Sequence, residues 1–315
     1  MTPLQRVSVI AFWFFIVSYA WGARDYGLKP LLIAPDTYVL LGANEHFNFR
    51  NGGNIVNTGF IVTDEGVIVI DSGPSRLYGE QLRAAIGRIT ERPILKLFNT
   101  HLHPDHILGN QAFEKLPIAA LATTIDGIWE QGELFNDSMY RLAGAWMAGT
   151  RVVVPTETVR PGSLEIGGHR LQLIAMKGHS HADLMILDQT TGVLFAADMV
   201  FHGRTPTTPH ADLGQWLDAL DALAELDFKL LVPGHGSVVE DRRSIEQTRD
   251  YLRWLNAYLH EAAEQGMTMA EVLQPDAPPS IRGLAVFKEE YQRSVPHLYP
   301  AIEARALRQG RVVQE

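Results

Sequence analysis

The sequence predicts an α/β protein in which two β-sheets pack face to face, with helices on the outside. Three observations favour this fold class. Two successive sets of short apolar runs have the length of strands, and segments with helical periodicity flank each set. The chain also has 315 residues, of which 46% are hydrophobic. It can therefore bury a full core, as one large domain or two small ones.

The first half of the chain contains both kinds of element. Apolar runs bounded by Gly, Asn and Asp predict strands, and apolar residues spaced by three or four positions predict helices. The strands are expected at residues 38–41, 55–62, 67–70 and 94–98, and the helices at 77–89 and 123–149. The turn at 64–66 makes the opening antiparallel. Tryptophans and methionines at helical spacing, Trp129 and Met139 among them, are assigned to the core.

The second half repeats this alternation and then becomes helical. The strands are expected at residues 164–166, 171–175, 184–187, 193–196 and 230–232, and the helices at 216–223 and 245–259. The remaining residues have mostly helical patterning, with a break at 275–279 where three prolines occur. The second set of strands therefore supplies the second sheet.

Charge and composition exclude several classes of function. The 27 Lys and Arg against 36 Asp and Glu give a net charge of −9, and no basic run is present, so nucleic acid is not an expected partner. A single Arg or Lys can still orient one substrate carboxylate. The chain has no cysteine, which excludes disulfides, thiolate nucleophiles and Cys-ligated zinc. Any metal must be bound by His, Asp or Glu.

Residues 1–22 are predicted to form a signal peptide. Arg6 precedes an apolar stretch from Val7 to Ala20, and small residues follow. The stretch is shorter than the roughly 20 residues that span a bilayer. We therefore expect export to the periplasm, cleavage near Ala20, and no stable membrane association afterwards. An uncleaved anchor and a buried helix are the alternatives.

The segment 99–106, with the sequence Asn-Thr-His-Leu-His-Pro-Asp-His, carries the strongest chemical signal. It follows a predicted strand, and in an extended chain His101 and His103 project to the same side. A turn at Pro104 then directs Asp105 and His106 toward a neighbouring point. Such an arrangement can supply two adjacent metal ions, whereas a solvated His-rich loop is the alternative.

Three later residues also follow predicted strands and stand beside small residues. They are His179 in Lys-Gly-His-Ser, Asp198 in Ala-Ala-Asp-Met, and His235 in Pro-Gly-His-Gly. Each by itself is typical of a loop or a helix cap. Together with the segment 99–106 they indicate a metal site.

These motifs resemble those of the metallo-β-lactamase superfamily of zinc hydrolases, over residues 36 to about 260. The family motif His-x-His-x-Asp-His is matched in full by residues 101–106. The resemblance implies a four-layer αβ/βα sandwich with the site at one edge, in a hydrolase domain spanning 30–315 with a helical C-terminal extension. Asp71 resembles an early Asp of the family that supports the site without binding metal.

The resemblance also implies two zinc ions and their ligands. The ligands are His101, His103 and His179 for the first ion, Asp105, His106 and His235 for the second, and Asp198 bridging both. The β-lactamases of the superfamily have Cys or Ser at the position of Asp198, so β-lactam hydrolysis is not favoured. The chain is also similar to exported relatives called quinoprotein relay zinc metallohydrolases, which implies a link to a periplasmic quinoprotein system.

We therefore expect an exported binuclear zinc hydrolase that cleaves a small-molecule acyl substrate (an ester, thioester or lactone) with a metal-bridging hydroxide. Asp105 is the expected catalytic residue, because it can orient that hydroxide or take its proton. The alternatives are a β-lactam hydrolase, a mononuclear iron oxidoreductase similar to persulfide dioxygenases, and a metal-stabilised carrier protein without activity.

The other histidines are weaker candidates. Those that can contact substrate are His46, His181, His202 and His210. His46 lies where family members have a mobile hairpin over the site, and His210 lies in a Pro-flanked loop. The three that are given no role are His169, His260 and His297.

Overall fold

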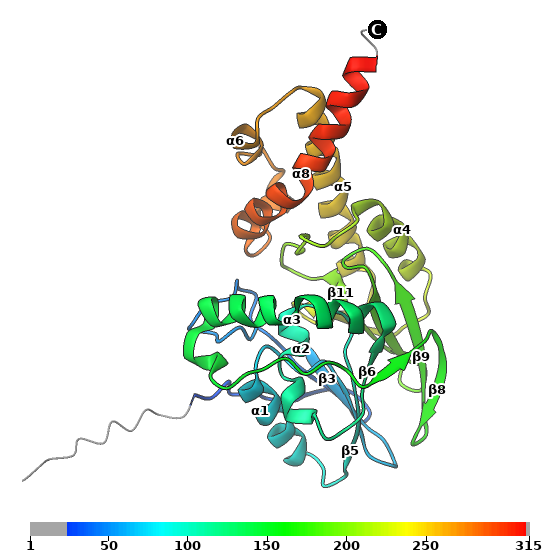
Figure 1. Ribbon diagram of the computed structural model, residues 1–315. Helices are drawn as coiled ribbons and strands as arrows, with labels where there is room; N and C mark the ends of the chain where they lie inside the picture. The colour runs from blue at the N-terminus through cyan, green and yellow to red at the C-terminus, as the bar shows by residue number, and fades with distance from the viewer. Residues whose placement is uncertain (1–23, 313–315) are drawn as a thin grey trace, which may run out of the picture.

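The computed structural model describes residues 24–312, so the segment predicted as a signal peptide lies outside the described residues. Two β-sheets face each other with helices on their outer faces, as Figure 1 shows. The predicted α/β sandwich is confirmed. No helix within residues 24–312 is both long enough and apolar enough to cross a bilayer.

The first sheet has seven strands in sequence order. They are β1 (Leu31–Ala34), β2 (Thr37–Leu40), β3 (Thr58–Val62), β4 (Val67–Ile70), β5 (Ile94–Phe98), β6 (Ile118–Leu121) and β7 (Glu157–Val159). Pairing is antiparallel from β1 to β4, as predicted, and parallel from β4 to β7. The carboxyl ends of β4 and β5 therefore meet at the same edge of the sheet.

The second sheet has five strands in the order β12-β11-β10-β9-β8. Their bounds are β8 (Gly162–Ile166), β9 (His169–Met176), β10 (Asp183–Asp188), β11 (Val193–Phe201) and β12 (Leu230–His235). The strands β8 to β11 are antiparallel, whereas β11 and β12 are parallel. This parallel pair brings the ends of β11 and β12 to one edge.

Apolar side chains of the first sheet point alternately to its two faces, and each face packs into a separate hydrophobic core. In β4, Ile68 and Ile70 point toward the second sheet, and Val67 and Val69 point toward the outer helix α1 (Arg76–Gly87). This period of two is the pattern of a sheet that is buried on both faces. Ser75 caps α1 by accepting a hydrogen bond from the Tyr78 amide.

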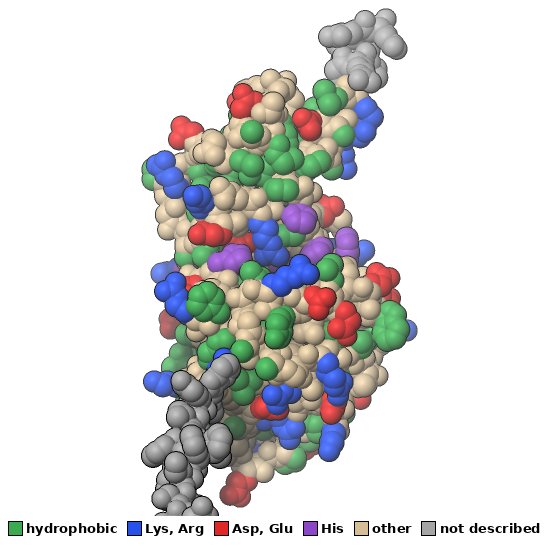
Figure 2. Space-filling model, turned by 60° about the vertical axis from the view of Figure 1, so that its left-hand side comes forward, with side chains coloured by type: hydrophobic (Ala, Val, Ile, Leu, Met, Phe, Trp, Pro, Cys, Tyr) green, Lys and Arg blue, Asp and Glu red, His purple; other side chains and the backbone are tan. Residues whose placement is uncertain are grey.

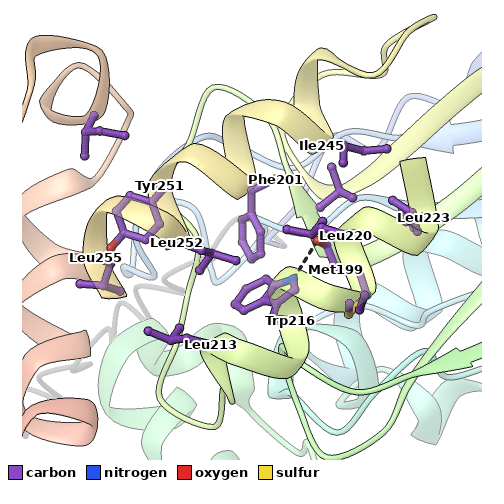
Figure 3. Packing of buried hydrophobic residues seen from close by; sticks show 14 of the residues in the cluster. Met199, Phe201, Leu213, Trp216, Leu220, Leu223, Ile245, Tyr251, Leu252 and Leu255 are labelled. Atoms are coloured by element: carbon purple, nitrogen blue, oxygen red, sulfur yellow. Dashed lines mark hydrogen bonds between the residues drawn. The ribbon is translucent and has the colours of Figure 1, made fainter. Parts of the chain in front are cut away.

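The outer face of the second sheet is covered by α4 (Leu213–Ala224) and α5 (Arg243–Glu264). Trp216 is at the centre of this core, fully buried, and its indole Nε1–H donates to the Met199 carbonyl at 3.0 Å. Phe201 and Leu220 pack around it (Figure 3). The indole thus fastens α4 to β11, the strand that carries Asp198.

The C-terminal extension is helical, as expected, and packs on α5 at one end of the molecule (Figure 1). Its elements are α6 (Met269–Val272), α7 (Pro279–Arg282) and α8 (Phe287–Val312). Aromatic rings pack between the two helices. The ring centroid of Trp254 in α5 lies 5.7 Å from that of Tyr291 and 5.8 Å from that of Phe287, both in α8. These contacts fix α8 against α5.

The remaining helical elements lie between β5 and β7, on either side of β6 in the chain. They are α2 (Pro104–Ile107), η1 (Asn110–Phe113), α3 (Ala122–Ala143) and η2 (Gly144–Met147). The helix predicted at 123–149 is α3, which ends before Gly144 because that residue has a φ of +61°. Two residues of this helix were predicted to lie in the core. The prediction is confirmed for Met139, which is 1% exposed, and wrong for Trp129, which is 79% exposed. Only part of α3 is covered by neighbouring elements.

Burial predicts very different effects for two tryptophan substitutions. Trp216→Ala removes a fully buried ring together with its hydrogen bond, and should lower the free energy of unfolding by about 3–5 kcal/mol. Trp129→Ala removes an exposed ring and should change it by about 0.5 kcal/mol or less. Denaturant unfolding of both variants measures the difference, and equal losses would contradict the packing described.

Candidate metal centre

The candidate ligands gather where the strands of the two sheets end. Residues 101–106 follow β5, His179 lies in the turn between β9 and β10, and His235 is the last residue of β12. Asp198 lies within β11, which runs on to Phe201 and not only to the predicted end at 196. A register shift at Ala197, whose φ is +45°, interrupts the pairing of β11 just before Asp198.

The turn after His103 has a local cause. His103 is extended, with φ −68° and ψ 149°, and Pro104 begins α2 with its fixed φ. Asp105 and His106 then lie in the first turn of α2. The extended stretch and the helical turn therefore aim two pairs of side chains at neighbouring points, as the sequence predicts.

All seven predicted ligands come together in two groups. Within each group the ligand atoms lie within 4.8 Å of one another, and no member is more than 6% exposed. The groups are His101, His103, His179 and Asp198, and Asp105, His106 and His235. This division separates the three histidines expected for the first ion from the three residues expected for the second, and it places Asp198 in the first group.

Asp198 connects the two groups. Its Oδ1 lies 3.1 Å from His106 Nε2, and its Oδ2 lies 3.4 Å from His179 Nε2 and 3.2 Å from His235 Nε2. Gly234 permits this position, because a Cβ there would lie 1.9 Å from Asp198 Oδ1. A single carboxylate is thus in reach of imidazoles from both groups.

Asp71, at the end of β4, supports two of the imidazoles from outside. It is 1% exposed and accepts from the Thr100 amide at 2.9 Å and from the Thr100 hydroxyl at 2.8 Å, and its Oδ2 lies 2.7 Å from His106 Nδ1. The carboxylate fixes the hydrogen on His106 Nδ1, and Thr100 Oγ1 accepts from His101 Nδ1 at 3.0 Å. With Nδ1 engaged in this way, both rings present Nε2 to the cluster.

Two other imidazoles are oriented from outside in the same way. His235 Nδ1 lies 2.7 Å from the Ile55 carbonyl, which can only accept, so Nδ1 carries a hydrogen and Nε2 is the atom that faces the cluster. His103 turns its Nδ1 inward and its Nε2 outward, where His210 Nδ1 lies at 2.8 Å. His210, which the sequence analysis placed only in a possible substrate loop, therefore also holds a candidate ligand.

The inward-facing atoms fit a bound cation. His103 Nδ1 lies 3.0 Å from His101 Nε2 and 2.8 Å from His179 Nε2, so several ring nitrogens converge on one point. Within residues 24–312, His106 Nε2 and Asp198 Oδ1 have no hydrogen-bond partner of suitable geometry. Buried donors and acceptors without partners are costly, and a metal ion is the occupant that satisfies a His and carboxylate set of this kind.

The electrostatics of the cluster agree with this interpretation. Burial lowers the pKa of His101, His103 and His179 well below its usual value. Burial opposes the charge of His106 too, but the carboxylates of Asp198 and Asp71 outweigh it and raise its pKa. The histidines beside Asp198 hold the pKa of its carboxyl group well below the usual range despite burial. A charged Asp198 beside neutral His101, His103 and His179 is a state that favours metal binding.

A cavity of 340 Å³ opens onto the cluster. Four of the candidate ligands line it: His103, Asp105, Asp198 and His235. Its outer wall includes His46 and His210, two of the histidines predicted as candidates for substrate contact. The other two candidates lie elsewhere: His181 lines a separate surface depression, and His202 Nδ1 lies 2.9 Å from the Ser237 hydroxyl.

Sequence reasoning missed two residues of the cavity wall. His297 was given no role, and Arg293 was not singled out, yet both line the cavity. They lie on α8, far along the chain from the His-rich segment. The only sequence signal was their spacing of four residues, which places two basic side chains on one face of a helix.

The chain belongs to the Metallo-beta-lactamase superfamily, which residues 51–235 match. It therefore carries a metal-dependent hydrolase domain of this superfamily.

Curated relatives of the chain are hydrolases. It is 24% identical over 282 residues to a linear primary-alkylsulfatase of Pseudomonas sp., an alignment that covers 75% of this chain and 53% of the relative. The chain thus spans about half the length of that protein. It is also 27% identical over 227 residues to the acyl-coenzyme A thioesterase MBLAC2 of Bos taurus, covering 65% of this chain and 81% of the relative.

Solved structures share the fold. The metallo-beta-lactamase from Pontibacter korlensis superposes with a TM-score of 0.60 at 20% identity, over 72% of this chain and 99% of that one. This similarity shows the sandwich fold.

Asp71→Asn tests the support of the metal site. An Asn side chain keeps the size of Asp71 and tolerates its φ of +59°, but it removes the charge that orients His106. We expect metal affinity to fall roughly 10- to 100-fold, measured by competition with a chelator. Asp64→Asn, on a side chain that is 88% exposed, is the matched control and should leave affinity unchanged. Unchanged affinity in Asp71→Asn would show that Asp71 does not act on the ligands.

Proposed function

We propose that this protein is an exported binuclear zinc hydrolase that cleaves a small acyl substrate, namely an ester, a thioester or a lactone. The observation that carries the proposal is the position of Asp198, a carboxylate that contacts imidazoles of both ligand groups. Such a carboxylate can bridge two metal ions. The names of two relatives, an acyl-coenzyme A thioesterase and an alkylsulfatase, support hydrolysis of ester-type bonds.

The residues that would hold the two ions are the seven of the cluster, with Asp198 shared. When bound, zinc supplies Lewis-acid polarisation of a substrate carbonyl and lowers the pKa of water to about 7. No cysteine is available as a nucleophile in this chain, and the proposed reaction requires none.

Asp105 is the proposed catalytic residue. It is 4% exposed, lines the cavity, and its Oδ2 lies 3.4 Å from His235 Nε2. From this position the carboxylate can hold the attacking water at the edge of the cavity and accept its proton. The proton then lies beside the bond that breaks, where the leaving group takes it up.

The wall formed by α3 binds the acyl part of the substrate. Leu134, Phe135 and Leu142 line the cavity from this helix, and Phe47 lines it from the loop after β2. Apolar side chains exclude water from the bond under attack and contribute roughly 25 cal/mol per Å² of buried apolar surface. The exposure of Leu134, at 66%, leaves this wall open to an entering chain.

Metal content and activity should depend on each other. We expect the purified protein to hold about two zinc ions and to lose ester hydrolysis on chelation and recover it with added zinc. Asp105→Asn should lose roughly 100-fold or more in kcat/KM and lower the zinc content, whereas Asp126→Asn, on the exposed face of α3, should do neither. One iron per chain would instead favour the oxidoreductase alternative, and no metal at all would contradict the proposal.

A substrate panel tests the acyl class. Because Asp198 occupies the position of the Cys or Ser of β-lactamases, esters, thioesters and lactones should be turned over faster than β-lactams. Initial rates on matched small substrates measure this. Faster turnover of a β-lactam than of every ester, thioester and lactone in the panel would contradict the assignment.

We also propose that residues 1–22 direct the domain 30–315 to the periplasm, where it serves a quinoprotein system. Support for export comes from the sequence, namely Arg6 followed by a short apolar stretch and small residues. The mature N-terminus should lie near residue 21, as read by mass spectrometry of the periplasmic fraction. An intact Met1 on membrane-bound protein would contradict export by a cleaved signal.

A further inference from the structure

We propose that α8 builds an oxyanion-binding site in the wall of the cavity, with Arg293 as its centre, and that the substrate is a small acyl compound carrying a carboxylate or sulfate group. This inference rests on the proposed acyl hydrolysis for the identity of the bond that is cleaved. The binding of the anion is separate from it and is tested separately below.

The position of α8 brings the two residues to the cluster. Arg293 and His297 are spaced by four residues and therefore lie on one face of α8. Both line the same cavity as His103 and Asp105. Figure 2 shows His side chains gathered with Arg and Lys side chains in a band across the middle of the molecule. The helix lies outside residues 51–235, which match the superfamily, so this wall is not part of the matched region.

Buried polar contacts hold α8 rigidly against the loops of the site. Arg204 and Glu290 are each 1% exposed and form an ion pair at 3.0 Å. Arg204 also donates to the carbonyl of Glu45, which directly precedes His46. On the next turn of α8, Ser294 accepts from the Thr208 hydroxyl at 2.6 Å, two residues before His210. The basic wall is thus preorganised, as a binding site requires.

The charge of Arg293 is only partly balanced. Its Nη1 lies 3.7 Å from Glu290 Oε2, but the other oxygen of Glu290 pairs with Arg204, so two guanidinium groups share one carboxylate. Among the described residues that line the cavity, the acidic ones are Asp105 and Asp198, which belong to the metal cluster. The side chain of Arg293 is 38% exposed and can reach a ligand.

Arg293 lines the same cavity as His210 and His103, and His210 Nδ1 lies 2.8 Å from His103 Nε2. The guanidinium group is a permanent positive charge in the wall of that cavity. It can attract and orient an anion on the substrate without a change of protonation.

The shape of the cavity limits the ligand. At 340 Å³ it is near the lower end of the roughly 300–1,000 Å³ typical of small-molecule sites. One wall is apolar and belongs to α3, and the other is basic and belongs to α8. The planar guanidinium fork matches the two oxygens of a carboxylate or a sulfate. A short acyl chain with one oxyanion therefore fits both walls.

Arg293→Gln tests the site with a pair of esters of equal chain length: the half-ester of a dicarboxylic acid and its neutral diester. We expect kcat/KM for the half-ester to fall roughly 10- to 100-fold, and that for the diester to change by no more than about twofold. Arg305→Gln, at an exposed position further along α8, makes the same change in net charge and should affect neither substrate. Equal loss on both esters, or no loss on the half-ester, would overturn the anion site.

A binding measurement separates this inference from the proposed function. The ligands are a keto acid, in which a methylene replaces the ester oxygen, its sulfonate counterpart, and the neutral ketone, each titrated calorimetrically into metal-loaded protein. Arg293→Gln should weaken binding of the acid or the sulfonate, and the larger loss identifies the anion. If wild-type protein hydrolyses no ester but shows this pattern, the hydrolase proposal fails and the anion site stands. Anionic and neutral ligands that respond alike would overturn the anion site.

Discussion

Five imidazoles and two carboxylates share one buried volume at the edge where the two sheets meet, and much of the structure serves to hold them there. Removing such groups from water costs several kcal/mol for each charge unless partners are supplied. The fold supplies partners to the ring nitrogens that face away from the cluster. Asp71 and Thr100, which follow strands of the first sheet, contact His106 and His101, and the Ile55 carbonyl contacts His235. The inner atoms are left facing one another, an arrangement that suits a bound metal.

Two of the four described non-glycine residues with a positive φ lie at the cluster. Asp71, directly after β4, has a φ of +59°, and Ala197, within β11, has a φ of +45°. Such conformations cost about 1–3 kcal/mol each. At Asp71 the cost is offset by the charged hydrogen bonds to Thr100. At Ala197 the irregular backbone lets Asp198 reach both groups of imidazoles.

Local patterns predicted most of the fold and all seven residues of the cluster, because a strand followed by a polar turn is a short-range signal. The directions of the side chains at 101–106 could be predicted from two local features, the alternation of side chains in an extended chain and the fixed φ of Pro104. Strands β1, β6 and β7 were missed for different reasons: β1 and β7 are short edge strands with exposed residues, and β6 runs directly into α3 without a turn signal. Arg293 and His297 could not be found, because helical spacing says nothing about which distant loop a helix packs against.

The buried pair of Arg204 and Glu290 joins a segment inside the superfamily match to a helix beyond it. The seven residues of the cluster lie within the matched region, whereas Arg293 and His297, which form the basic wall of the cavity, lie beyond it. A substitution on the face of α8 that lines the cavity can therefore change that wall while the seven residues of the cluster stay the same. Substrate selectivity and the metal centre can thus vary independently of each other.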